Sequence, residues 1–202
     1  LNRSPVNALS FDLLYSLKEI FEDMLKDKNI RAVIIQSELD HFSAGADLKE
    51  RKIMSKDDAG KALDNFNDCF NTIESFPTPV ICLINGYCLG GGAELSLACD
   101  FRIGSDDCLI GFPEVSIGII PGAGGTQRLP KVIGLSNAKY WIYTAKKFNS
   151  EQSLDYGFLD FTCNKSNLLN KGIDLAKDIL LNAPIAIKSS KKSINDGYST
   201  NI

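Results

Sequence analysis

The chain has 202 residues, of which 44% are hydrophobic and 23% are charged, a balance typical of one soluble globular domain with a substantial core. Its formal net charge of -3 at pH 7 gives no indication of a polyanion-binding surface. The longest apolar runs are far shorter than a membrane-spanning helix requires, and the first residues resemble neither a signal peptide nor an arginine-rich transit peptide.

The first third of the chain predicts helices around a buried strand. Apolar residues recur at helical spacing over residues 9–26, and Ser10 is a suitable N-cap for that helix. The β-branched run within residues 31–38 predicts a buried strand, and the loop after it turns helical near Leu48. Helical spacing returns over residues 57–75, which predicts another long helix.

The next segments predict short strands that alternate with helices. The sequence PTPVICLING, residues 77–86, predicts a strand that ends at its Asn-Gly pair. A helix is expected from about residue 91 to 99, followed by two short strands within residues 100–112. A glycine-rich turn within residues 121–134 opens the next helix.

The order of these elements predicts an α/β fold with parallel strand pairing in its first part. Helical patterns dominate from residue 135 to the end. We therefore divide the chain into a core over residues 1–134 and a helical C-terminal region over residues 135–202. No internal repeat or low-complexity tract interrupts this division.

Six cysteines and a single histidine limit the metal and redox chemistry of the chain. No two cysteines have CxxC spacing, and Cys82 and Cys99 lie in apolar segments, where a thiol behaves as a small hydrophobic group. We therefore expect free thiols and a reducing compartment. One histidine, His41, is too few for a histidine-rich zinc site, so no metal is expected.

Three consecutive glycines, residues 90–92, stand at the entrance of the helix predicted over residues 91–99, and Glu94 falls in its first turn. A helix N-terminus presents unpaired N–H groups, and glycines let an anion come close to them. Phosphate-binding templates fail, because neither the P-loop lysine nor the third glycine of a dinucleotide fingerprint is present. Two interpretations stay open: an oxyanion hole beside an acid–base glutamate, or a tight turn before a helix with a favourable acidic residue.

Four segments together resemble the enoyl-CoA hydratase/isomerase family, also called the crotonase family. They are FSAGADLKE (residues 42–50), INGYCLGGGAELSLACDFRI (84–103), GFPEVSIGIIPGAGGTQRLPKVIG (111–134) and AIKSSKKSIN (186–195). The motifs follow the family's order and spacing along the whole chain, so the combination is more specific than any one of them. AGADLKERKIMS is most similar to the branch that contains methylglutaconyl-CoA hydratase and enoyl-CoA hydratase domain-containing protein 2.

The resemblance implies a crotonase-like spiral of ββα turns with a helical C-terminal region. That region is expected to be incomplete here, since the family pattern continues beyond the final NDGYSTNI. The resemblance also implies an acyl-CoA substrate, no cofactor beyond the coenzyme A of that substrate, and a homotrimer or hexamer of the full-length protein. A mitochondrial location and a role in fatty-acid or branched-chain amino-acid breakdown are implied by the resemblance alone.

The family motifs also imply the site residues. The backbone N–H groups of Ala46 and Gly91 would form an oxyanion hole, and the two catalytic acids fall on Glu94 and Glu114. The implied substrate-binding residues are Ala46, Asp47, Leu48, Lys49 and Gly91. Without the resemblance, we would interpret Glu114 as a surface residue that follows a proline.

Two carboxyl groups suit the hydration of a double bond. They can hold one water between them, direct it at the β-carbon and deliver a proton to the α-carbon. We assign the α-carbon proton to Glu114 and the activation of water to Glu94. Burial and mutual repulsion are expected to raise one of the two pKa values. The presence of both glutamates favours a hydratase. An isomerase is the first alternative activity.

RNA binding and a non-catalytic role on the same fold are the remaining alternatives. RNA binding requires a basic helix face. The first predicted helix carries Lys18 and Lys26 but also Glu19, Glu22 and Asp23, so its face is not basic and we expect no RNA partner. The intact set of implied site residues argues against a non-catalytic protein.

Three other features complete the predictions. His41 would need a serine in a nucleophile elbow to act in a triad, and no GxSxG motif is present, so we expect an exposed loop histidine. Trp141 and Tyr143 are expected in the core or in subunit contacts. The segment 49–58 is mixed in charge and is expected to be solvated and mobile, and a border of the acyl pocket is the alternative.

Overall fold

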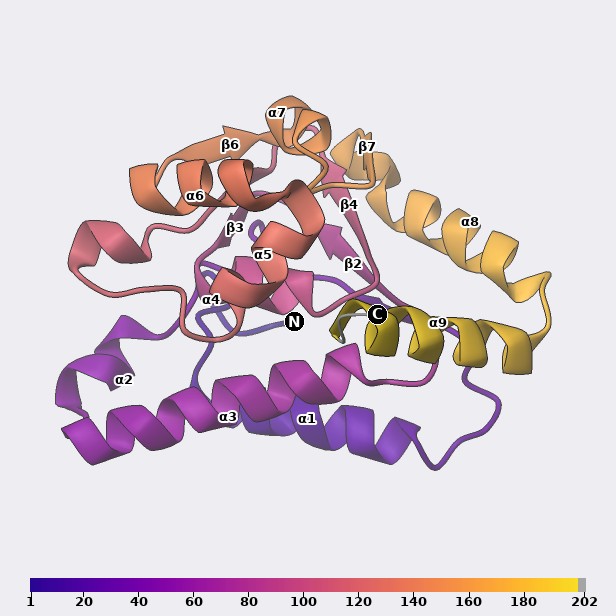
Figure 1. Ribbon diagram of the computed structural model, residues 1–202, viewed down its shortest axis with the longest axis horizontal. Coiled ribbons are helices and arrows are strands. Elements are labelled where there is room, and N and C mark those ends of the chain that lie inside the picture. The colour runs from indigo at the N-terminus through magenta and orange to yellow at the C-terminus, as the bar shows by residue number, and fades with distance from the viewer. Residues whose placement is uncertain (200–202) are drawn as a thin grey trace.

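The computed structural model describes the backbone of residues 1–199 and, within it, all side chains except those of residues 53, 56, 57, 59, 198 and 199. Among these residues the strands form two sheets (Figure 1). The four-stranded sheet has the order β1-β2-β4-β7 and is parallel, and the three-stranded sheet has the order β3-β5-β6. The strands are β1 Val33–Ile35, β2 Val80–Ile84, β3 Tyr87–Leu89, β4 Phe101–Ser105, β5 Leu109–Gly111, β6 Lys147–Asn149 and β7 Phe161–Cys163.

Helices cover the sheets on more than one side (Figure 1). The α-helices are α1 Phe11–Met24, α2 Leu48–Ile53, α3 Lys56–Glu74, α4 Gly91–Leu97, α5 Gly125–Ile133, α6 Leu135–Thr144, α7 Ser150–Asp155, α8 Leu168–Leu180 and α9 Pro184–Ser199. Two short 3-10 helices are η1 Glu114–Ile117 and η2 Lys165–Asn167. Within the described part of the chain, no helix is both long enough and apolar enough to cross a membrane.

The central strand β2 is buried along its whole length, because a parallel sheet is covered on both faces. Side chains of a strand alternate between the two faces. Ile81 and Leu83 pack against α8 in one apolar cluster. Val80, Cys82 and Ile84 join the main core, to which α1, α3 and α4 contribute. The sheet therefore separates two apolar layers and is stabilised from both sides.

The predicted helices and strands of the first two thirds of the chain are confirmed. Ser10 caps α1 as expected, since its Oγ accepts a hydrogen bond from the backbone N–H of Leu13 at 3.2 Å. A capping box at Ser55 and Asp58 begins α3. The parallel pairing predicted for the first part is also present, in β1, β2 and β4.

Helices dominate from residue 135 onward, as expected, but two short strands interrupt them. Strand β6 pairs with β5 in an antiparallel arrangement, and β7 extends the parallel sheet beside β4. Strand β3 was not predicted either. Each of these strands has three residues, which is too short for an alternating pattern to appear in the sequence. The positions of these strands do not test the division of the chain into residues 1–134 and 135–202, which stays a prediction.

An aromatic cluster around α6 ties the C-terminal part to the main core. Trp141 is fully buried, and its ring stacks on Phe148 and Phe158 with centroids 4.1 and 5.4 Å away. The prediction of a core position is confirmed for Trp141. Tyr143, two residues further along the same helix, is 70% exposed and does not belong to the core.

We expect Trp141→Ala to lower the free energy of unfolding by about 3–5 kcal/mol, because it leaves a large cavity in a packed aromatic cluster. Tyr143→Ala on the same helix is the control and should change that free energy by about 0.5 kcal/mol or less. Urea unfolding followed by circular dichroism measures both. Similar losses in the two variants would contradict the placement of Trp141 in the core.

Candidate active site

The backbone N–H groups of Ala46 and Gly91 lie close together where two chain segments meet. Ser43 pairs with Cys88 in an isolated parallel bridge, which brings the loop 43–46 against the end of β3. Gly91 is the first residue of α4, and a Cβ atom added to it would lie 3.5 Å from the nitrogen of Ala46. No hydrogen bond to another described residue engages either N–H. Both donors are therefore available to bind one oxygen atom.

Glycines make this close approach possible. Gly45 has a φ of +94°, and a Cβ atom there would lie 2.7 Å from the backbone oxygen of Leu89. A Cβ atom at Gly92 would lie 2.7 Å from the Cβ of Ser43. The glycine run at the start of α4 thus serves contact between backbones, and it leaves the helix N-terminus open to an anion.

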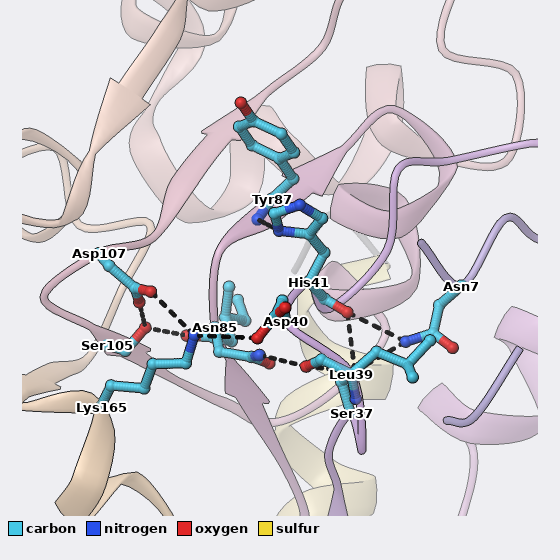
Figure 2. A network of polar contacts seen from close by, with 11 residues as sticks. Asn7, Ser37, Leu39, Asp40, His41, Asn85, Tyr87, Ser105, Asp107 and Lys165 are labelled. Carbon is cyan, nitrogen blue, oxygen red and sulfur yellow. Dashed lines mark hydrogen bonds and ion pairs between the residues drawn. The ribbon is translucent and has the colours of Figure 1, made fainter. Parts of the chain in front are cut away.

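A polar network fixes the segment that leads into the loop 43–46, as Figure 2 shows. The backbone oxygen of His41 accepts hydrogen bonds from Asn7 Nδ2 at 3.0 Å and from Ser37 Oγ at 2.7 Å. His41 Nδ1 accepts a hydrogen bond from the backbone N–H of Tyr87 at 3.2 Å, and the two rings stack with centroids 4.4 Å apart. His41 is therefore a half-buried structural residue, and the expectation of an exposed loop histidine is wrong.

The network continues to the turn between β2 and β3 and to the end of β7 (Figure 2). Asn85 Nδ2 donates a hydrogen bond to the backbone oxygen of Leu39 at 2.7 Å. Lys165 forms ion pairs with Asp107 at 3.1 Å and with Asp40 at 3.9 Å. Segments distant in the sequence thus hold the start of the loop that presents the N–H of Ala46.

Glu94 lies in the first turn of α4 and is 3% exposed. Its Oε1 accepts hydrogen bonds from the backbone N–H groups of Ala123 at 2.8 Å and Gly125 at 2.9 Å. Burial raises the pKa of Glu94 to about 7; the two N–H donors oppose this rise, and the negative charge of Glu114 adds to it. This carboxyl group can therefore take up or release a proton near neutral pH.

Glu114 is the first residue of η1 and is 9% exposed, so the interpretation as a surface residue is wrong. A Cβ atom at Gly90 would lie 2.7 Å from its Oε1, which places the carboxyl group over the entrance of α4. Its Oε2 is buried and has no hydrogen-bond partner among the described residues. Burial raises the pKa of Glu114, whereas a hydrogen bond from its own backbone and the charge of Arg51 lower it.

A cavity of about 330 Å³ connects these groups. Its lining includes every residue that the sequence resemblance implies for the site: Ala46, Asp47, Leu48, Lys49, Gly91, Glu94 and Glu114. The remaining wall is largely apolar and includes Leu63, Phe66, Ile117, Ile119 and Ile120. Arg51 brings a positive charge to the same cavity, so the start of the segment 49–58 borders the site, which was the alternative interpretation of this segment.

The arrangement has the parts needed for proton transfer next to a stabilised oxyanion. Two N–H donors can bind an oxygen that gains negative charge, and two buried carboxyl groups with raised pKa values can exchange protons beside it. All six cysteines are free thiols. Among the described residues, no group of three or more histidine, cysteine, aspartate or glutamate side chains is arranged to hold a metal ion.

Sequence reasoning missed the residues that hold Glu94. Ala123 and Gly125 act through backbone N–H groups, which every residue type except proline provides. The available signal was the glycine-rich turn at residues 121–125, since such turns bind anions and a buried glutamate is one. Arg128, which contacts the same turn, was also missed.

Comparison with known proteins decides the family. A family model described as enoyl-CoA hydratase/isomerase matches residues 1–202. The chain belongs to the enoyl-CoA hydratase/isomerase family. Its fold is therefore the crotonase fold that the sequence motifs imply, and the cavity with Glu94 and Glu114 is the candidate active site of a family member.

Individual relatives agree with this assignment. The chain is 37% identical to mouse (Mus musculus) mitochondrial methylglutaconyl-CoA hydratase over 201 residues, covering 97% of this chain and 64% of the relative. It is 37% identical to a short-chain-enoyl-CoA hydratase of Clostridium acetobutylicum over 198 residues, covering 98% of this chain and 76% of the relative. A crystal structure of an enoyl-CoA hydratase from Bacillus anthracis superposes with a TM-score of 0.93 at 40% identity, covering 96% of this chain and 76% of that one.

The predicted similarity to the methylglutaconyl-CoA hydratase branch of the enoyl-CoA hydratase/isomerase family is thereby confirmed. The chain spans between 59% and 78% of the length of its curated relatives. The names of these family members describe longer proteins, so the activity, substrate and partners of this chain are taken up below as proposals.

We expect the parent chain to lose stability relative to Glu94→Gln as the pH rises from about 4 to about 7. Glu94 has a pKa of about 7 when folded, against about 4.3 in an unfolded chain, so the folded state holds more protons in this window. The loss should approach about 3–4 kcal/mol and level off above the folded pKa. Urea unfolding at several pH values measures it, with Glu151→Gln at an exposed carboxyl group as the control. Parallel pH curves for the parent and Glu94→Gln would show that Glu94 does not titrate this way.

Proposed function

We propose that the chain is an enoyl-CoA hydratase, which adds water across the 2,3-double bond of a 2-enoyl-CoA thioester. One observation carries this proposal: two buried carboxyl groups with raised pKa values open into the same cavity as two unengaged backbone N–H groups. The hydratase names of its relatives support the same reaction class.

In the proposed reaction, the thioester oxygen binds the N–H groups of Ala46 and Gly91. Addition at the β-carbon moves negative charge onto that oxygen as an enolate. The two donors and the positive end of α4 stabilise this charge, and each donor is worth about 3 kcal/mol in a site of this kind. The largely apolar wall lowers the local dielectric constant and so strengthens this stabilisation.

The two glutamates divide the proton transfers. Glu94 in its ionised form takes a proton from the water while the water oxygen bonds to the β-carbon. Glu114 in its protonated form gives its proton to the α-carbon as the enolate collapses. The proton held by Glu94 then returns to Glu114 by way of the next water, so the site starts each turnover with one proton. Such a pair titrates as a unit, and its active form is singly protonated.

The cavity walls are compatible with the proposed acyl-CoA substrate. Coenzyme A enters as part of the substrate, so the proposal needs no separate cofactor. Ala46, Asp47, Leu48 and Lys49 would face the coenzyme A portion, and the apolar wall would face the acyl group. We propose a role in fatty-acid or branched-chain amino-acid breakdown, as the family resemblance implies.

The proposal extends to assembly and location. We propose a homotrimer or hexamer for the full-length protein, which sedimentation analysis tests. We propose a mitochondrial location on the names of the mitochondrial relatives, although bacterial relatives are as similar. An isomerase is the alternative activity, because double-bond shift needs the same oxyanion donors but only one carboxyl group. No membrane or RNA partner is proposed.

We expect the chain to remove the enoyl-thioester absorbance of crotonyl-CoA, and Glu94→Gln and Glu114→Gln to lower kcat by about 100- to 10,000-fold each. Glutamine keeps the shape of the side chain but carries no exchangeable acid proton of suitable pKa. Glu151→Gln, far from the cavity, serves as the control. Full activity in either glutamine variant would refute the two-carboxyl mechanism. A folded but inactive protein, both as this chain and extended to the length of its relatives, would refute the activity.

We expect Arg51→Gln to move the alkaline limb of the kcat/KM profile to higher pH. The charge of Arg51 lowers the pKa of Glu114, and its removal lets that pKa rise, so the acid stays protonated at higher pH. Arg51→Lys keeps the charge and should leave the limb in place. Since Arg51 is exposed, the shift should shrink at high salt. An unchanged or lowered limb in Arg51→Gln would contradict this interaction.

A further inference from the structure

The position of Glu94 depends on a turn of backbone rather than on side chains. Its Oε1 is held by the N–H groups of Ala123 and Gly125, at 2.8 and 2.9 Å. Ala123 lies in the turn of residues 122–124, and Gly125, which follows that turn, is the first residue of α5. Both hydrogen bonds therefore persist only while this turn keeps one conformation. A turn of small residues has many accessible backbone conformations, so other contacts must hold it in place.

Arg128, in the first turn of α5, contacts the preceding turn through the backbone oxygen of Ala123. It is 9% exposed. Its Nη1 donates a hydrogen bond to the backbone oxygen of Ala123 at 3.1 Å. Its Nε and Nη2 donate to Glu74 Oε2 at 3.1 and 2.7 Å, and Nη2 also donates to Asn71 Oδ1 at 2.8 Å. Ala123 is thus held at both ends, by Glu94 at its N–H and by Arg128 at its oxygen.

The residue between the two N–H donors is adapted to the guanidinium group. Gly124 has a φ of +97°, and a Cβ atom there would lie 2.0 Å from Arg128 Nη1. Only glycine leaves room for the arginine at this point. Glu74 and Asn71, which fix the other side of the guanidinium group, belong to α3, so a long helix anchors the whole arrangement.

We propose that Arg128 is a positioning residue for Glu94: its guanidinium group, anchored on Glu74 and Asn71, fixes the turn that binds one oxygen of the catalytic carboxyl group. The planar fork is essential, because it bonds to three partners in fixed directions at once. A lysine would keep the positive charge but would reach fewer of these partners. This inference rests on the proposed function only for the consequence to catalysis, since the hydrogen bonds are independent of any reaction.

The proposal separates a positioning role from a purely structural one. If the turn loosens, the two N–H bonds that oppose the raised pKa of Glu94 weaken, and that pKa rises further. The other charges that act on Glu94 are those of Glu114, on η1, and of Arg128 itself. Arg128→Lys keeps the positive charge, so a shift in that variant reports the turn and not the loss of charge.

The test is a titration of Glu94 followed by NMR in protein with ¹³C-labelled glutamate side chains, assigned with Glu94→Gln. In Arg128→Lys we expect the midpoint of Glu94 to rise by about one pH unit. With crotonyl-CoA, kcat should fall by about 10- to 100-fold while KM changes by less than about twofold, because the catalytic group is misplaced and the substrate contacts remain. Glu74→Gln, which keeps an acceptor oxygen but loses the charge, should give a smaller shift in the same direction.

Arg102→Lys is the matched control. Arg102 is 5% exposed and also donates to backbone oxygens, those of Phe158 at 2.7 Å and Cys99 at 3.0 Å, but it does not contact the turn. That variant should lose stability without moving the titration of Glu94. An unchanged Glu94 midpoint in folded Arg128→Lys would overturn the proposal; if that variant does not fold, an unchanged midpoint in Glu74→Gln would do so. A raised Glu94 midpoint in Arg128→Lys, together with a parent that hydrates no enoyl-CoA either as this chain or extended to the length of its relatives, would support the positioning role and refute the proposed function.

Discussion

Two backbone segments, residues 43–46 and 89–92, run so close together that no side chain fits between them, and the candidate active site depends on this contact. A Cβ atom at Gly45 or Gly92 would come within 2.7 Å of the opposite segment. The contact sets the N–H of Ala46 beside the N-terminus of α4 and fixes the direction of that helix. The depth at which Glu94 is buried follows from the direction of α4. One steric constraint thus positions both the oxyanion donors and a carboxyl group.

Burial of two carboxyl groups in one cavity costs folding energy, and the surrounding backbone offsets part of it. The N–H groups of Ala123 and Gly125 stabilise the ionised form of Glu94, whereas Oε2 of Glu114 has no partner among the described residues. An unpaired buried oxygen is unfavourable for stability alone. It is expected where a protein keeps an acid ready for a substrate, since active sites give up stability for function.

The sequence predicts the long helices and several buried strands because these leave local signals, whereas the site residues are implied by the resemblance to the enoyl-CoA hydratase/isomerase family. Ser10 and the spacing of apolar residues mark α1, and glycines mark the start of α4. The strands β6 and β7 leave no such signal, since three residues are too few to show a period and their partners lie far along the chain. The burial of Glu114 and the hydrogen bond from Arg128 to the turn before α5 also depend on tertiary contacts. No pattern of neighbouring residues in the sequence indicates them.

The two-sided covering of β2 has a consequence for biosynthesis. Ile81 and Leu83 face α8, which lies roughly a hundred residues later in the chain. At typical translation rates this apolar face stays uncovered for about 5–20 s after β2 leaves the ribosome. During that interval the exposed apolar face of β2 can bind chaperones or aggregate. It becomes protected from water only when α8 has been synthesised and has packed against it.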